Sequence, residues 1–218
     1  TDIGLTTVKV QNWDNTVTYG LGFRLRDQDP SIIGLAAGAT GYSVNGDDGN
    51  QNYDTGIFTN AAKINSELEF SYKGFGGFVR FYGFYDFENE NGDRARTPLS
   101  DDALERVGSR AEFRDAFLYY RFKLGGRPGE LRAGWQVINW GESTFIQGGI
   151  NAINPFDVSA LRVPGAELRE ALMPVGAVKL SLKPTGNTSI DAFYQFTWDE
   201  LKLDPVGSYF SSTDLAGA

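Results

Sequence analysis

The 218-residue sequence contains no cysteine and no histidine. Without cysteine, the chain can form no disulfide and offers neither a thiol nucleophile nor a thiolate metal ligand. Without histidine it lacks the commonest general base and metal ligand, which excludes a Ser-His-Asp triad and the HExxH zinc motif. A catalytic serine would need an unusual base, so the sequence predicts a protein that is not an enzyme and that needs no cofactor.

Basic residues and long apolar runs are also scarce. There are 20 Lys and Arg against 28 Asp and Glu, a formal net charge of -8, which argues against a nucleic-acid partner because phosphate binding needs clustered cations. No apolar run approaches the roughly 20 residues of a transmembrane helix. The sequence also opens without the charged and apolar regions of a signal peptide, so for an exported protein we expect the signal peptide to lie outside this sequence.

Glycine and aromatic residues are abundant, with 27 Gly, 16 Phe, 10 Tyr and 4 Trp, which is typical of β-structure. The segment Thr16–Arg26 alternates without a break between apolar and other residues. Its length suits a tilted strand that crosses a bilayer, about 9 to 11 residues. The same period of two predicts six further strands: Lys63–Tyr72, Phe78–Phe87, Asp115–Leu124, Leu131–Val137, Val178–Lys183 and Ser189–Trp198.

Short and long connections alternate between these strands. The short ones are Lys73–Gly76, Gly125–Glu130 and Pro184–Asn187, and the long ones are Asp27–Ala61, Glu88–Ala111 and Gly141–Gly176. Transmembrane barrels have tight periplasmic turns and long external loops, so we expect an all-β fold, an antiparallel outer-membrane β-barrel. Because single bacterial chains close with an even strand number, seven strands predict that residues 1–218 are the N-terminal part of one larger barrel domain.

Alternation alone does not say whether the apolar face meets lipid or a core, since a lipocalin-like barrel or a β-sandwich gives the same stripes. Charges of both signs in mid-strand favour a wet lumen on the polar face, and aromatic residues near strand ends favour lipid on the other. The polar face supplies the predicted lumen-lining residues: Arg24, Glu67, Arg80, Asp115, Arg121, Arg132, Gln136 and Asp191.

The longest connection, Gly141–Gly176, has apolar content of its own. It contains the turn signal Asn154-Pro155-Phe156-Asp157, and Ala166–Met173 is rich in helix formers and ends before Pro174. A short helix is therefore expected. The loop either folds inward as a constriction, for which Asn154, Pro155, Phe156 and Asp157 are the candidate residues, or caps the barrel rim.

A second connection concentrates oxygen ligands in a Gly-rich stretch that contains Asp47, Asp48 and Asp54. Such a stretch can hold Ca²⁺, but the spacing does not match an EF-hand loop. Acidic surface loops are usually just solvated. We therefore expect no bound metal and keep these three carboxylates as a weak Ca²⁺ candidate.

The segment Gly134–Ser143, with the sequence GWQVINWGES, resembles the G-x-Q-x-x-x-W-G-E-S signature of a bacterial outer-membrane family known as domain of unknown function 1302. Trp140, Gly141, Glu142 and Ser143 form the centre of this motif. Further pieces agree with the family pattern in order: Trp13–Thr16, Asp47–Asn50, Asn65–Leu68, Asn154–Asp157, Val163–Ala166 and Gly207–Phe210. The likeness runs nearly from end to end, and since family members are longer, it too suggests an N-terminal portion.

The resemblance implies a location in the outer membrane of a Gram-negative bacterium. It also implies partners: outer-membrane lipid, a periplasmic lipid-binding protein and an inner-membrane transporter of the resistance-nodulation-division type. The expected function is that of a channel or transfer component for amphipathic, lipid-like molecules, although a shared fold and shared partners do not establish a molecular function. The alternative is a structural or adhesive barrel whose acidic external loops bind a partner or Ca²⁺ while nothing passes through.

Overall fold

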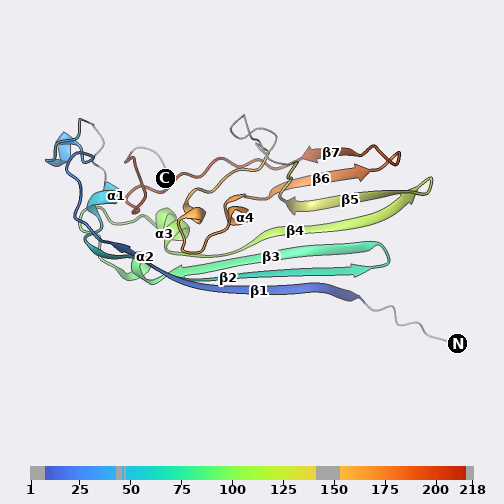
Figure 1. Cartoon of the computed structure of the whole chain (residues 1–218), viewed down its shortest axis with the longest axis horizontal. Coiled ribbons are helices and arrows are strands. Elements are labelled where there is room, and N and C mark those ends of the chain that lie inside the picture. Colours follow the sequence, from blue (N-terminus) through green and yellow to red (C-terminus); the bar gives the residue numbers. More distant parts are fainter. Residues whose placement is uncertain (1–7, 43–45, 47, 141–152, 215–218) are drawn as a thin grey trace.

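The computed structural model describes residues 8–42, 46, 48–140 and 153–214, apart from the side chain of Ala36. Seven strands form one antiparallel sheet in sequence order (Figure 1). The strands are β1 (Lys9–Arg24), β2 (Gly56–Tyr72), β3 (Phe75–Asp86), β4 (Ser109–Leu124), β5 (Arg127–Gln136), β6 (Val175–Leu182) and β7 (Ile190–Gln195). The predicted all-β fold with seven antiparallel strands is confirmed.

The two kinds of connection lie at opposite ends of the sheet (Figure 1). Tight turns follow β2, β4 and β6 at one end, called the turn end below, and long connections follow β1, β3 and β5 at the other, called the loop end. Within the described residues β1 pairs only with β2 and β7 only with β6. The sheet is therefore open, and these residues do not close a barrel by themselves.

Most strands begin earlier than the alternation predicts. The strand β2 begins at Gly56 instead of Lys63, because residues 56–62 continue to pair with the end of β1 although they do not alternate strictly. At their other ends, β1 stops at Arg24 and β7 at Gln195, two and three residues before the predicted limits. The amides of Phe196 and Thr197 both donate to the carbonyl of Gly176, which ends the regular pairing of β7.

A bulge explains the early start of β4. Val79 pairs with Ala116 and Phe81 with Phe113, so β4 carries one more residue than β3 between these pairs. The extra residue changes the frame of alternation inside the strand. As a result Arg114 and Asp115, although adjacent, are both buried, with exposed fractions of 4% and 5%.

The two faces of the sheet differ in chemistry and in cover. One face, called the outer face, presents apolar side chains to the surroundings: Val17 is 75% exposed, Leu118 64% and Tyr194 73%. The opposite, inner face carries polar and charged side chains that are nevertheless buried, among them Lys63 and Gln136. A soluble sandwich would have the reverse arrangement, with its apolar stripe inside.

The cover on the inner face comes from residues 153–174, called the inner loop. It contains a short 3-10 helix, η3 (Ser159–Leu161), and one helical turn, α4 (Leu168–Ala171), which lies over the sheet in Figure 1. Val163 packs there against Ala61, Tyr82 and Phe84 from β2 and β3. The predicted helix over Ala166–Met173 is too long, because Leu172 already forms a bridge with Phe156.

Short helices gather at the loop end: η1 (Leu35–Ala37), α1 (Asp48–Gln51), α2 (Phe87–Asn91) and α3 (Asp101–Val107). Ser100 caps α3 by accepting a hydrogen bond from the amide of Ala103 at 3.1 Å. Across the described residues, no helix has both the length and the apolar character needed to cross a membrane.

Candidate functional site

The predicted lumen residues lie on the inner face, where ion pairs link neighbouring strands. In the middle of the sheet, Arg80 on β3 forms an ion pair with Asp115 on β4, and its Nη1 lies 4.0 Å from Glu67 Oε1 on β2. The second Asp115 oxygen accepts a hydrogen bond from the amide of Val137 at 3.0 Å. Three of the predicted residues therefore form one continuous polar contact across three strands.

A second group of charges lies nearer the turn end. Arg121 on β4 and Arg132 on β5 both bind Glu130, each at 2.9 Å. Their guanidinium carbons lie 4.4 Å from the ring centres of Tyr119 and Phe117, respectively, a distance at which cations and aromatic faces attract. The predicted residues Arg121 and Arg132 are thus brought together through a carboxylate.

The remaining predicted lumen residues have separate surroundings. Gln136 is buried and donates from its Nε2 to the carbonyl of Ala177 at 2.9 Å. Asp191 on β7 accepts a hydrogen bond from Ser181 and lies 4.0 Å from the Lys179 ammonium. Arg24 is at the loop end, where its Nη1 donates to the carbonyls of Asn50 and Tyr53 at 2.8 and 2.9 Å. Arg24 therefore fastens a connection and does not join the ladder of charges on β2 to β7.

A third group involves the predicted constriction residue Asp157. Its carboxylate pairs with Arg110 on β4 at 2.8 Å and accepts hydrogen bonds from the amide and hydroxyl of Ser159 at 3.0 and 2.5 Å. Burial alone would raise the pKa of Asp157, but the Arg110 charge and these hydrogen bonds outweigh it, so the pKa lies below its ordinary value. Asp157 thus holds the inner loop to the wall as a carboxylate.

The other predicted constriction residues fasten the same loop. Asn154 is buried and bridges the backbone of Ile138, accepting from its amide at 3.1 Å and donating to its carbonyl at 2.8 Å. The carbonyl of Pro155 accepts from the amide of Met173, and that of Phe156 from the amide of Lys202, both at 2.9 Å. The segment therefore lies inside the fold and is tied at several points.

Glu170 makes the most buried ion pair of the described residues, and the alternation pattern does not predict this pair. The Lys63 ammonium on β2 lies 2.7 Å from Glu170 Oε2, and both side chains are 2% exposed. Asn65 donates to Glu170 Oε1 at 2.7 Å, and Lys63 also donates to the carbonyl of Gly165 at 2.8 Å. The pair joins α4 to the middle of the sheet over a separation of 107 residues.

Glycine on β1 allows the inner loop to approach closely. A Cβ added at Gly20 would lie 2.3 Å from the Cβ of Pro164, a distance at which something must shift. The neighbouring Gly165 has a φ of 69° and lies against Thr18 of the same strand. The alternate small residues on the inner side of β1 therefore form the surface on which the loop rests.

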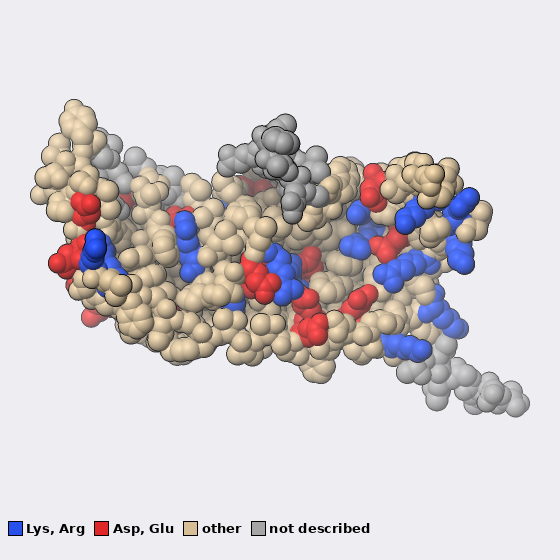
Figure 2. Space-filling model, viewed as in Figure 1, with Lys and Arg blue, Asp and Glu red and all other residues tan. Residues whose placement is uncertain are grey.

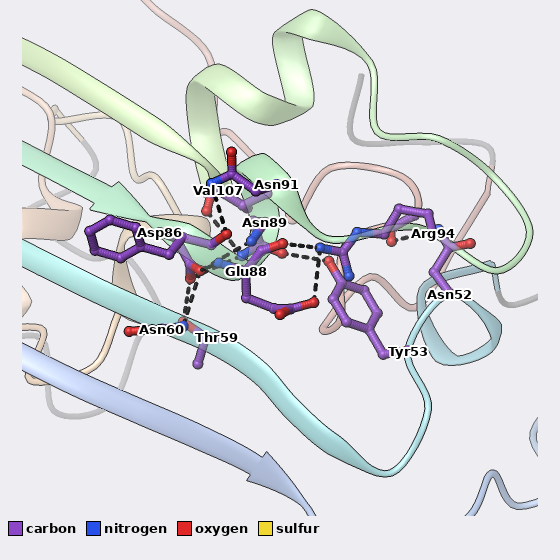
Figure 3. A network of polar contacts seen from close by, with 12 residues as sticks. Asn52, Tyr53, Thr59, Asn60, Asp86, Glu88, Asn89, Asn91, Arg94 and Val107 are labelled. Atoms are coloured by element: carbon purple, nitrogen blue, oxygen red, sulfur yellow. Dashed lines mark hydrogen bonds and ion pairs between the residues drawn. The ribbon is translucent and has the colours of Figure 1, made fainter.

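At the loop end, Asp86 organises a separate polar network (Figure 3). Its carboxylate accepts hydrogen bonds from the Thr59 hydroxyl and from the amides of Asn60, Glu88 and Asn89, and so caps α2. The guanidinium carbon of Arg94 lies 4.2 Å from the centre of the Tyr53 ring, and burial raises the pKa of Tyr53 to about 12. The network ties the long connections to β2 and β3.

The weak Ca²⁺ candidate is only partly described. The Asp48 carboxylate lies 2.7 Å from Arg96 Nε and accepts a hydrogen bond from Thr97 at 2.6 Å, while Asp54 is exposed and Asp47 lies outside the described residues. Among the described residues no group of three or more acidic side chains is placed to hold a metal ion. The Asp48 oxygens serve here as partners of protein groups.

The family motif is also divided. The ring of Trp140 packs edge-on against Phe193 of β7, with 5.2 Å between ring centres. Gly141, Glu142 and Ser143 lie outside the described residues, so their arrangement stays a prediction.

A family model with the description "protein of unknown function (DUF1302)" matches residues 8–218, which agrees with the resemblance stated from the sequence. Neither a curated protein nor a solved structure matches the chain.

Proposed function

The chain belongs to this family of unknown function, whose description assigns no activity, and from the geometry of the two faces we propose that it forms part of the wall of an outer-membrane β-barrel in a Gram-negative bacterium. The barrel passes amphipathic, lipid-like molecules between the two ends of the sheet. The inner face lines the passage, and the inner loop narrows it.

The proposal is carried by the apolar band on the outer face and its aromatic borders. In the strand register, Tyr19 and Tyr85 flank Ala62 in one row near the loop end. Tyr72, Phe75 and Tyr120 share another row near the turn end, where the Phe75 and Tyr120 rings stack at 4.4 Å between centres. Aromatic residues gather in this way at the two interfaces of a membrane.

The height of the band fits a bilayer. The two aromatic rows are separated by the stretch of β2 from Ala62 to Tyr72, which at about 3.4 Å per residue spans roughly 34 Å along the strand. With strands tilted by about 45°, this gives roughly 24 Å along the membrane normal, close to the apolar band of about 25 Å in outer-membrane barrels. Between the rows the outer face carries such residues as Ile64, Leu68 and Phe81.

Lipid exposure is tested by placing one charge inside the band and one outside it. Val79 pairs with Leu68 and Ala116, about midway between the aromatic rows, whereas Leu124 is the last residue of β4, beyond the aromatic row at the turn end. In lipid, Val79→Arg should cost about 2 to 4 kcal/mol of unfolding free energy and Leu124→Arg about 0 to 1 kcal/mol. Unfolding of the native protein from vesicles, read by heat-modifiable migration, measures both variants. Equal, small losses would mean that the apolar face meets water, and the membrane proposal would fail.

Passage is tested by reversing charges on the inner face. Arg121 and Arg132 share Glu130. The double variant Arg121→Glu with Arg132→Glu therefore replaces two cations around one carboxylate by three neighbouring carboxylates. We expect altered conductance and ion preference in planar bilayers, together with a changed uptake of a charged amphipathic solute. Unchanged conductance and uptake would remove the lumen assignment while leaving the membrane assignment intact.

The second candidate is a structural or adhesive barrel without transport, and the ordered loop end favours it. The buried Asn52 there donates to the carbonyls of Thr97 and Gly207 and accepts from the amides of Arg96 and Thr97, so it holds the connections of the loop end in one arrangement. Shortening the connection 92–99 separates the two functions. Loss of surface binding with no change in permeation would favour adhesion, whereas increased leak would favour transport.

A further inference from the structure

Basic side chains gather at the turn end of the sheet, in a chain whose net charge is -8. The row that runs through Lys9, Ser71, Gly76, Tyr119, Arg132 and Lys179 marks its limit. From this row outward the described residues include two carboxylates, Glu130 and Asp191, and eight basic residues: Lys9, Lys73, Arg121, Lys123, Arg127, Arg132, Lys179 and Lys183. Figure 2 shows this blue group at the right, over the ends of β4 to β7.

A cleft of about 700 Å³ lies within this group, along the adjacent ends of β4, β5, β6 and β7. Clefts that hold amphiphile-sized ligands have volumes of about 300 to 1,000 Å³. Three cations line it, Arg121, Lys123 and Lys183, together with the apolar ring of Pro128. The Phe122 and Leu182 side chains belong to the intervening row of the register and point to the outer face. The cations suit an anionic head, and Pro128 offers an apolar contact to the chain that carries it; the amphipathic character of the ligand comes from the proposed function.

The two carboxylates of the cleft do not cancel its cations. Glu130 is already bound by Arg121 and Arg132, and Asp191 lies beside Ser181 and Lys179. Lys123 and Lys183 have no ion pair with any described carboxylate. Both ammonium groups therefore have donors to offer to an incoming anion.

We propose that this cleft binds an anionic amphiphile, a molecule with a carboxylate or phosphate head and an alkyl chain, through Lys123 and Lys183. The assignment deepens the proposed function and rests on it: it names the charge of the amphipathic molecule and the end of the passage at which it is held. The Arg121–Glu130–Arg132 group continues from the cleft along the inner face, so the head would leave the cleft beside further cations.

A binding experiment tests the proposal independently of transport. The native protein in nanodiscs of phosphatidylcholine is titrated with dansylaminoundecanoic acid, and with its uncharged amide as the apolar control. We expect the acid to bind at least tenfold more tightly than the amide, and the difference to shrink as salt is raised. Equal binding of acid and amide would overturn the proposal, because the cations would then contribute nothing.

Matched variants locate the site. Lys123→Glu with Lys183→Glu reverses the cleft cations, whereas Lys73→Glu with Arg127→Glu makes the same change of charge at the same end but outside the cleft. The first pair should weaken binding of the acid by tenfold or more, since each charged contact is worth on the order of tenfold, and the second by less than about threefold. Equal losses of affinity in both double variants would mean that only the overall positive potential of this end attracts the acid, and the assignment of a binding site to the cleft would be wrong.

Two further arms identify the source of the anion. Inorganic phosphate at the same concentration should compete weakly; if it competes as well as dodecyl phosphate, the alkyl chain is irrelevant and the amphiphile proposal is overturned. Phosphatidylglycerol is then added to the nanodisc. If it displaces the probe, the natural ligand is an anionic bilayer lipid, and if probe binding is unchanged, the ligand is a free amphiphile. Both results support an anionic amphiphile. If an acidic peptide binds and the fatty acid probe does not, the cleft is a protein-docking surface and the amphiphile proposal is refuted. Because membrane residence and conductance are measured separately, failure here leaves the proposed function standing.

Discussion

Removing the Glu170 carboxylate should release the inner loop from the wall of the sheet. In Glu170→Ala the Lys63 ammonium stays in place, 2% exposed, with the carbonyl of Gly165 as its remaining described partner. Breaking a buried pair by removing one partner typically costs about 3 to 5 kcal/mol, because a buried charge is left uncompensated. At 25 °C this shifts an equilibrium by roughly two to four orders of magnitude.

The loss falls on the docking of the loop, since the strands keep their own hydrogen bonds. Glu170 binds through both carboxylate oxygens to β2, using Lys63 and Asn65, and no strand pairing depends on it. We therefore expect faster amide exchange and faster proteolysis across residues 153–174, together with a raised open conductance, while heat-modifiable migration is retained.

Two controls separate the ion pair from general disturbance of α4. Glu167→Ala removes a neighbouring carboxylate whose side chain is 51% exposed and whose partner is Arg169, so it should cost less than about 1 kcal/mol. Lys63→Met with Glu170→Leu replaces the pair by apolar side chains and should restore most of the docking, because such replacements are often neutral or stabilising. If residues 153–174 of Glu170→Ala exchange their amides and are cleaved as slowly as in the parent chain, the buried pair is not what holds the loop.

Other residues give narrower predictions. The pKa of Asp157 is lowered in the folded protein, so its contribution to docking is fully present above the ordinary value of 3.8 and is lost as the pH falls through the folded pKa; proteolysis of the inner loop with an acid-stable protease should accelerate there, and an identical pH profile in Asp157→Asn would contradict this. Gly20→Leu should displace Pro164 and expose residues 153–174 to exchange, whereas Gly186→Ala, where an added Cβ meets nothing, should leave exchange unchanged; no difference between the two would show that the close approach is not needed. Absorbance titration should find a tyrosine that ionises near pH 12, and Tyr53→Phe should remove this titration step. If the step near pH 12 is the same in Tyr53→Phe, then Tyr53 is accessible to water.

The assignment of residues to faces could be predicted from the sequence, and the ends of the strands could not. A period of two is enough to place Arg80 and Arg132 on one side and Leu118 on the other, because neighbouring side chains of a strand must point to opposite faces. It fails in β4 at Arg114 and Asp115, where the bulge turns two successive side chains inward. Nothing in the local pattern marks that position, since pairing with β3 decides it.

Contacts of the inner loop were the least predictable part. The sequence predicts the turn at Asn154–Asp157, but whether the loop constricts or caps depends on partners such as Arg110, which is 47 residues away from Asp157. Glu170 lies in the stretch predicted to form a short helix, and its partner Lys63 begins a predicted strand. A pairing over such a distance leaves no local signal in one sequence.

The pairing of each strand with its successor also sets an order for folding. The hairpins β2–β3, β4–β5 and β6–β7 have tight turns and bring together residues that are near in sequence, so their closure costs little chain entropy, and each can then pair with the next hairpin along the chain. The contact between Lys63 and Glu170 spans 107 residues and becomes cheap only after the strands between them have assembled. The inner loop is therefore expected to dock last, so the proposed passage would form open and be narrowed only in the final step of assembly.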